Sequence, residues 1–269
     1  MLFNRLLIRL ATAAALIAAL LAALFWLDRP AFSAVIAVVV VLAGSEWASL
    51  CGIRSAGAWA YGLACAVIFL SLTQIAGAAP WMSALAVVFW LSVAPATLAR
   101  ARGSVAFWIA CGVLVLAPAA LALLALPPKL ALLTLGLVWI ADTGAYLAGT
   151  TFGRHKLAPK ISPGKTWEGV AGGAVGSLIY AMICVVFSPD LGGRVEGVIW
   201  VPFAAGALAL FALSVIGDLF KSVLKRQAGV KDSGKLLPGH GGVLDRIDSA
   251  TATLPLALLL LMAAEAARR

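Results

Sequence analysis

The chain has 269 residues, of which 63% are hydrophobic and 12% charged, and it carries a formal net charge of +9. A mean hydropathy of +1.06 excludes an ordinary soluble domain, whose composition is much less apolar. The composition predicts an all-α, polytopic integral membrane protein with polar loops that hold most of the excess positive charge.

Nine apolar windows are long enough to cross a hydrocarbon core of about 30 Å, which takes about 20 helical residues. They lie near residues 6–27, 31–50, 57–78, 81–99, 104–126, 130–149, 169–188, 198–216 and 249–265. We therefore expect about nine transmembrane helices in one integral-membrane domain covering 1–269. Its N-terminal spans occupy 1–128, and the spans and loops with most of the polar chemistry occupy 129–269.

Basic residues are distributed asymmetrically over the loops between these windows. With the N-terminus in the cytoplasm, 15 of the 20 basic residues fall on the cytoplasmic side, as the positive-inside rule requires. Both large polar loops, 150–168 and 217–248, then lie on one cytoplasmic face. Topology needs only Lys and Arg, whereas these loops also contain Asp, Gly, His and Pro, so we expect them to bind a polyanionic ligand.

The N-terminal half offers few polar signals. Glu46 and Trp47 lie near the end of the second window, where we favour an interfacial anchor over a substrate contact. The cysteines lie within or at the ends of apolar windows without C-x-x-C spacing, and we expect them to be inert packing residues: Cys51, Cys65, Cys111 and Cys184.

The sixth window contains a carboxylate at membrane depth. In its run WIADTGAYLAG, helical spacing places four residues on one face: Asp142, Ala145, Tyr146 and Gly149. An intramembrane aspartate usually faces the bundle interior and a partner. A functional ligand and a hydrogen-bond anchor between helices both stay open for Asp142.

The loop at 153–168 combines lysines with glycine and proline. Pro159 and Pro163 forbid a continuous helix, so an ordered loop should lead into the seventh span. Ser162 or Thr166 is expected to cap that helix, with Glu168 in its first turn. The run Gly-Lys-Thr at 164–166 is not a Walker loop, because residue 159 is not glycine. A Lys-rich and Gly-rich loop before a helix N-terminus nevertheless suits phosphate oxygens.

The loop at 217–248 is the most polar part of the chain. If the eighth span continues as a helix past Gly217, one face carries Asp218, Lys221, Ser222 and Lys225. Asp245 and Asp248 likewise share a face at the start of the ninth span. Three carboxylates among Lys and Arg suit a hydrated magnesium ion that carries phosphates, and a salt-bridge network that holds the loop is the alternative. His240 is either a phosphate donor or a loop hydrogen-bonding residue.

Four runs of residues resemble the phosphatidate cytidylyltransferases, also called CDP-diacylglycerol synthases. They are W-x-x-D-x-x-A-Y-x-x-G at 139–149, I-S-P-x-K-T-W-E-G at 161–169, S-x-L-K-R-x-x-x-x-K-D at 222–232 and L-P-G-H-G-G-x-L-D-R-x-D at 237–248. The resemblance covers residues 139–249, and the N-terminal half matches only as generic spans. The chain departs from the family pattern at Gly164, where many members have a second lysine.

The resemblance implies transfer of a cytidylyl group from CTP to phosphatidate, giving CDP-diacylglycerol and pyrophosphate. The implied catalytic residues are Asp218, Lys225, Asp245 and Asp248. The implied Mg²⁺ ligands are Asp218, Asp245, Asp248 and Asp142, and a second, monovalent cation is left open. The implied substrate-binding residues are Ser162, Lys165, Ser222, Arg226, Lys231, His240 and Arg246.

The charge distribution and the resemblance together indicate where the protein works. We expect a multi-pass protein of the inner (plasma) membrane whose active site faces the cytoplasm in a cleft open to the bilayer, with membrane lipid but no nucleic acid as a partner. A homodimer is left open.

Three other functions are considered. A CDP-alcohol phosphotransferase would require a D-G-x-x-A-R motif, which the chain lacks. A cation-coupled transporter would explain Asp142 but not a basic, Gly-rich cytoplasmic platform. A scaffold would tolerate replacement of the loop aspartates.

Overall fold

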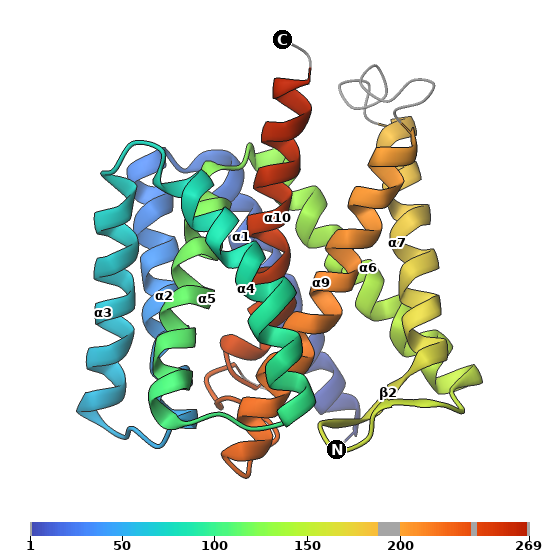
Figure 1. Cartoon of the computed structure of the whole chain (residues 1–269), viewed down its shortest axis with the longest axis horizontal. Helices are drawn as coiled ribbons and strands as arrows, with labels where there is room; N and C mark the ends of the chain where they lie inside the picture. Colours follow the sequence, from blue (N-terminus) through green and yellow to red (C-terminus); the bar gives the residue numbers. More distant parts are fainter. Residues whose placement is uncertain (1, 188–199, 238–240, 268–269) are drawn as a thin grey trace.

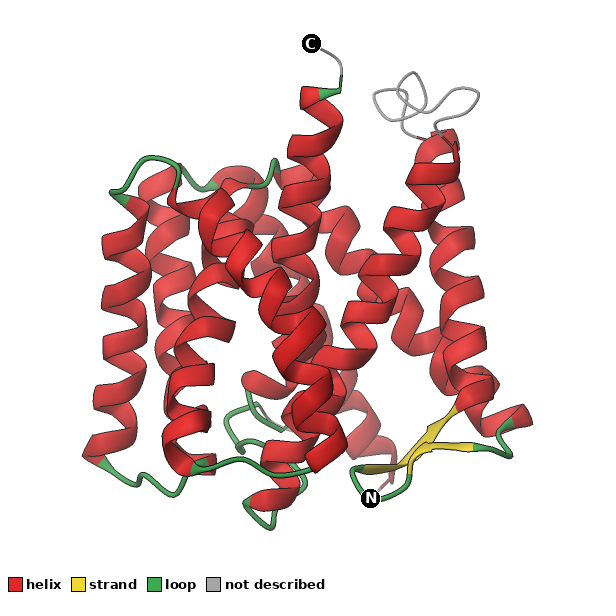
Figure 2. Cartoon of the chain, in the orientation of Figure 1, coloured by secondary structure: helices red, strands yellow, loops and turns green. Residues whose placement is uncertain are grey.

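The computed structural model describes residues 2–187, 200–237 and 241–267, with side chains described from Leu10 onward. Within these residues the chain forms nine helices and one two-stranded hairpin (Figures 1 and 2). The helices are α1 (Leu2–Trp26), α2 (Arg29–Leu50), α3 (Ala56–Thr73), α4 (Ala78–Arg100), α5 (Val105–Ala125), α6 (Pro128–Phe152), α7 (Trp167–Phe187), α9 (Trp200–Gln227) and α10 (Leu244–Ala266). The strands are β1 (Lys156–Ala158) and β2 (Ser162–Thr166).

Most of these helices can span a bilayer. Eight of them, α2 to α7 together with α9 and α10, are long and apolar enough to cross a membrane, and α1 adds a shorter apolar stretch, Leu10–Trp26. The prediction of a polytopic all-α membrane protein is confirmed. The last two helices also contain polar residues beyond the predicted windows, because α9 continues to Gln227 and α10 already begins at Leu244.

The two polar loops lie at the same end of the bundle. Figure 1 shows the hairpin and the turn after α9 at the end where the chain begins, and the C-terminus at the opposite end. The loops that follow α2 and α4 lie at the hairpin end as well. The structure thus places together the loops that the charge distribution assigns to one face.

Aromatic packing joins α9 to the N-terminal helices. The ring of Phe220 lies 5.1–6.5 Å, centroid to centroid, from the rings of Trp47, Phe89, Trp90 and Trp108. Trp47 is fully buried, and its Nε1 donates a hydrogen bond to the carbonyl of Trp108 at 2.8 Å. The predicted interfacial anchor is therefore wrong, because the indole of Trp47 belongs to this core.

The four cysteines are all free thiols. Cys65 and Cys111 are buried, and Cys111 belongs to the same core cluster as Trp47. A packing role is therefore consistent with their positions.

The loop at 153–168 is ordered as predicted, although part of it forms antiparallel strands. Lys156 pairs with Thr166, and Ala158 pairs with Ser162. Pro163 is tolerated because a two-stranded hairpin has only edge strands. The hydroxyl of Thr166 accepts the N–H of Gly169 at 3.1 Å, which confirms it as the predicted cap of α7.

The side chain of Glu168 fixes the hairpin to the first turn of α7. Its carboxylate accepts the backbone N–H of His155 at 3.2 Å and lies 2.7 Å from His155 Nδ1. The hairpin therefore has a defined position relative to the spans.

Candidate active site

Close packing of α9 and α10 brings Asp218 and Asp248 together. A Cβ atom at Gly217 would lie 3.0 Å from the Cβ of Ala252 and 3.0 Å from the carbonyl oxygen of Asp248. A side chain at this position would require α10 to move by a few tenths of an ångström. One turn away, the hydroxyl of Ser249 donates a hydrogen bond to the carbonyl of Ser214 at 3.2 Å. As a result, the carboxylates of Asp218 and Asp248 interact electrostatically.

A third carboxylate, Asp142, reaches the same region from α6. It interacts electrostatically with the carboxylates of Asp218 and Asp248 and with the cations of Lys165 and Arg246. The position of α6 depends on tight packing against α7, where a Cβ at Gly144 would lie 2.8 Å from the carbonyl of a glycine, Gly172. Asp142 is exposed, whereas Asp218 and Asp248 are partly buried, and like charges at such positions require cations for compensation.

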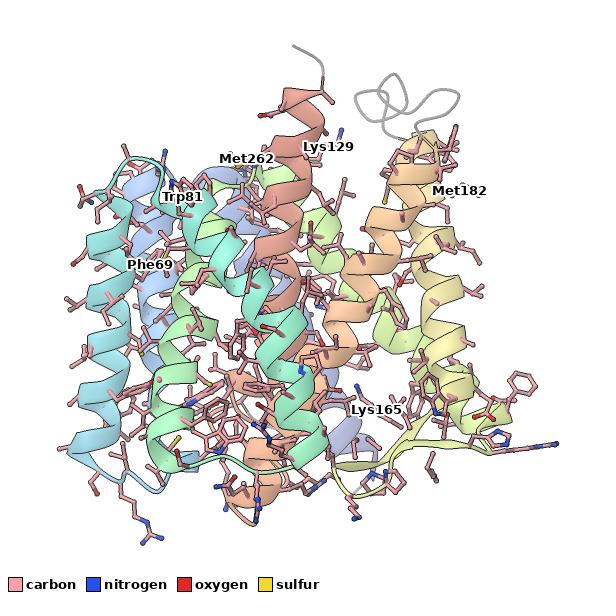
Figure 3. All side chains as sticks on the ribbon, in the orientation of Figure 1. Phe69, Trp81, Lys129, Lys165, Met182 and Met262 are labelled. Carbon is pink, nitrogen blue, oxygen red and sulfur yellow. The ribbon has the colours of Figure 1, made fainter. Side chains whose placement is uncertain are left out.

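The hairpin supplies one of these cations. Lys165 of β2 forms an ion pair with Asp218, each side chain being 26% exposed, and Figure 3 shows Lys165 between the hairpin and α9. Arg226 of α9 holds the turn between the two strands, because its Nε donates a hydrogen bond to the carbonyl of Ile161 at 3.1 Å. The loop predicted to bind phosphate is thus positioned against the carboxylates.

A second cation, Lys221, lies inside the protein and was not among the predicted site residues. Its side chain is 1% exposed, and its Nζ donates to the carbonyl of Ile247 at 3.3 Å. It interacts electrostatically with Asp218, Asp245 and Asp248. Its spacing from Asp218 placed it on the polar face of α9, but the sequence did not show that this face packs against α10.

Asp245 has a different environment from the other carboxylates. Its Oδ1 lies 2.8 Å from Lys225 Nζ, and its Oδ2 accepts the N–H groups of Ser233 at 2.7 Å and Gly242 at 3.2 Å. The carboxyl side chain is 8% exposed and that of Lys225 is 14% exposed. Both oxygens are therefore engaged, so that Asp245 holds Lys225 and the loop before α10.

The other predicted residues are distributed around this centre. The hydroxyl of Ser222 lies 3.5 Å from Asp218 Oδ1, at the limit of a hydrogen bond. Ser162 begins β2, while the side chains of Lys231, in the turn after α9, and Arg246, in the first turn of α10, are exposed. His240 lies outside the described residues.

Glu46 is a buried residue that the sequence did not assign to this region. It belongs to α2, and its carboxylate accepts hydrogen bonds from the side chain of Ser233 and from the backbone of Val243 and Leu244. A carboxylate in an apolar window signals a partner. Its partners are 187 to 198 residues away, so local spacing does not reveal them.

The donor atoms around Asp218 suit a hard cation. Asp142, Asp218 and Asp248 provide carboxylate oxygens, which Mg²⁺ prefers, and the ammonium group of Lys165 already binds one of them. Within the described ranges, no three His, Cys, Asp or Glu side chains are close enough to hold an ion as they stand. The chemistry of the site fits magnesium, and the metal ligands stay a prediction.

Pockets at the polar end of the bundle lie away from these carboxylates. One of about 460 Å³ lies between α4 and α5 and is lined by Arg100 and Arg102 among others. Another, of about 230 Å³, lies beside Glu46 and the loop at 233–236. The carboxylates of Asp142, Asp218 and Asp248 line neither, so the cleft open to the bilayer stays a prediction.

Comparison with known proteins agrees with the resemblance noted in the sequence. Residues 7–264 match the model of the cytidylyltransferase family. A phosphatidate cytidylyltransferase of Pseudomonas aeruginosa is 40% identical over 268 residues, which cover 95% of this chain and 97% of the relative. A protein of the same name from Haemophilus influenzae is 54% identical over 122 residues, which cover 44% of this chain and 41% of the relative. One from Staphylococcus saprophyticus is 44% identical over 132 residues, which cover 46% of each chain. The chain therefore belongs to the cytidylyltransferase family.

Proposed function

We propose that the protein transfers a cytidylyl group from CTP to phosphatidate, forming CDP-diacylglycerol and releasing pyrophosphate. The observation that carries the proposal is the close packing of α9 on α10 beside Asp218 and Asp248, with Lys165 of the hairpin paired to Asp218. Asp142 of α6 interacts electrostatically with both carboxylates. Asp142, Lys165 and Asp248 belong to family-like runs in the sequence, and Asp218 lies just before the run that begins at Ser222. The names of the relatives support the same reaction.

The reaction places few demands on general base catalysis. The phosphate of phosphatidate is a monoester with a second pKa of about 6, so it is largely ionised at neutral pH. Its oxygen forms a bond to the α-phosphorus of CTP while the bond to the bridging oxygen of pyrophosphate breaks. The required help is charge neutralisation and in-line placement of the two phosphates.

The residues of the site suit these tasks. Magnesium would be held by Asp218 and Asp248, with Asp142 beside them, and when bound it would neutralise the triphosphate and the departing pyrophosphate. Lys165 can exchange its bond to Asp218 for a phosphate oxygen, since both groups are partly accessible. Because both oxygens of Asp245 are engaged, we propose that it positions Lys225 rather than binding metal.

Two exposed basic residues would bind phosphate oxygens, and a third would hold the hairpin. We assign Arg246 and Lys231 to this role, because their side chains are exposed at the polar end of the bundle. Arg226 would act mainly by holding the hairpin turn at Ile161.

The setting of the reaction follows from the charge distribution. We propose a multi-pass protein of the inner membrane with its site on the cytoplasmic side, because most basic residues belong to the loops at that end. CTP would enter from the cytoplasm, while the acyl chains of phosphatidate stay in the bilayer.

Pyrophosphate release by the purified protein in mixed micelles tests the proposal. CTP, Mg²⁺ and phosphatidic acid are supplied together and then omitted in turn, and the lipid product is identified. Release that needs all three and yields CDP-diacylglycerol supports the proposal. A folded protein that binds CTP without this release contradicts it and indicates transfer to another lipid, whereas a folded protein that binds no nucleotide favours a transporter.

A further inference from the structure

We infer that Glu46 of α2 is a positioning residue for the active site, which it controls through the loop that precedes α10. This inference rests on the proposed function. Glu46 Oε2 accepts the hydroxyl of Ser233 at 2.8 Å and the N–H of Leu244 at 2.8 Å, and Oε1 accepts the N–H of Val243 at 3.0 Å. The residue is 8% exposed, so these bonds replace water as its hydrogen-bonding partners.

The position of Glu46 matches the unsatisfied donors of α10. The first N–H groups of a helix have no acceptor within the helix, and the dipole there favours negative charge. Val243 is the N-cap of α10 and Leu244 is its first residue. The side chain of Val243 makes no capping hydrogen bond to the first turn. A carboxylate from α2 thus provides the cap that the local sequence lacks.

Two glycines allow the loop to lie directly on this carboxylate. A Cβ atom at Gly234 or at Gly242 would collide with the carboxylate oxygens of Glu46. Neither glycine has a positive φ, so close approach explains them better than backbone conformation does. This part of the glycine-rich run therefore serves contact with Glu46.

The same loop also contacts Asp245 in the first turn of α10. Ser233 is bound from two sides, because its hydroxyl donates to Glu46 and its N–H donates to Asp245. Asp245 in turn holds Lys225, which interacts electrostatically with Asp218 and with Asp248. Hydrogen bonds thus join α2 to Lys225, and electrostatic interactions join Lys225 to the proposed metal ligands.

This arrangement gives the N-terminal half a role in the reaction. Glu46 does not contact the proposed metal ligands, so it acts by fixing the first turn of α10. If Glu46 is disturbed, Asp248 and Arg246 lose their register relative to α9. Turnover should then fall more than lipid binding does, because Glu46 bonds to Ser233 and the start of α10 and acts on the reacting groups through them.

Glu46→Gln tests the inference, because the amide keeps the shape but puts a donor against other donors. We expect kcat to fall about 10- to 100-fold, as loss of a bond to a charged acceptor implies, with KM for phosphatidate changed less than about twofold. Trypsin cleavage after Lys235, whose side chain is exposed, should become faster under native conditions. Gly242→Ala should reproduce both effects from the other side of the contact, and Glu265→Gln, an exposed carboxylate near the end of α10, serves as the control.

The outcomes separate this inference from the proposed function. If the unsubstituted protein forms CDP-diacylglycerol and Glu46→Gln matches it in kcat and in cleavage rate, the inference is refuted and the proposed function stands. A variant that only melts at a lower temperature, with unchanged kcat per folded molecule, also refutes it. A wild-type protein that makes no CDP-diacylglycerol refutes the proposed function, and faster cleavage at Lys235 in Glu46→Gln would then still support the contact between α2 and the loop.

Discussion

The ion pair of Asp245 and Lys225 offers a direct test of how the site is assembled. Oδ1 of Asp245 lies 2.8 Å from Lys225 Nζ, and Oδ2 accepts two backbone N–H groups. Because these side chains are 8% and 14% exposed, water has little access to replace a lost partner. Asp245→Asn keeps the shape of the side chain but leaves one oxygen atom for three donors.

The expected magnitude follows from these contacts. If the asparagine oxygen keeps the two backbone donors, its NH₂ group faces the ammonium of Lys225. One hydrogen bond to a charged group is lost, worth about 1.5–3 kcal/mol, and removal of one partner of a buried pair costs about 3–5 kcal/mol. Because the substitution keeps some polarity, we expect the free energy of unfolding to fall by about 3 kcal/mol. A similar loss in the transition state lowers kcat about 100-fold.

A double-mutant cycle measures this coupling. Asp245→Asn, Lys225→Met and the double variant are compared by reversible unfolding in mixed micelles and by pyrophosphate release. We expect a coupling energy of about 2 kcal/mol or more in stability, since the residues share one buried contact. If the single effects add to within about 0.5 kcal/mol, or if Asp245→Asn turns over like the wild type, the assigned role of Asp245 is wrong.

Three further predictions concern the carboxylates and the hairpin. Asp248→Asn should lower kcat at least 100-fold and raise the Mg²⁺ concentration for half-maximal activity, which a titration checks; an unchanged titration would remove it from the ligand set. Lys165→Gln should raise KM for CTP about tenfold by removing a phosphate contact. KM is measured at several salt concentrations, because the effect should shrink as salt screens the charge. An unchanged KM would mean that Lys165 does not bind the nucleotide and only pairs with Asp218. Gly217→Ala should lower the free energy of unfolding by about 1–3 kcal/mol by pushing α10 away from α9, which thermal unfolding measures. Gly164→Ala is the control and should change stability little, because a Cβ there meets no atom within 4 Å.

Local patterns predicted much of the fold, and they predicted which polar residues share a helix face. Hydropathy located the spans, because a bilayer imposes a length and an apolar composition on every helix that crosses it. Helical spacing predicted that Asp218 and Lys225 share a face, and the continuous α9 confirms it. The resemblance in the C-terminal half identified the family, which the match over residues 7–264 confirms.

Other features depend on residues that are distant in sequence. The sequence determined that this is a polytopic helical membrane protein with its polar chemistry in two loops, because hydropathy and helical periodicity are local properties. Only the tertiary structure decided that Trp47 packs on Phe220, that Asp245 holds Lys225, and that Glu46 caps α10. Each of these contacts joins residues of different helices. The free energy that stabilises each contact comes from burial and pairing between those helices, which residue spacing along the chain does not predict.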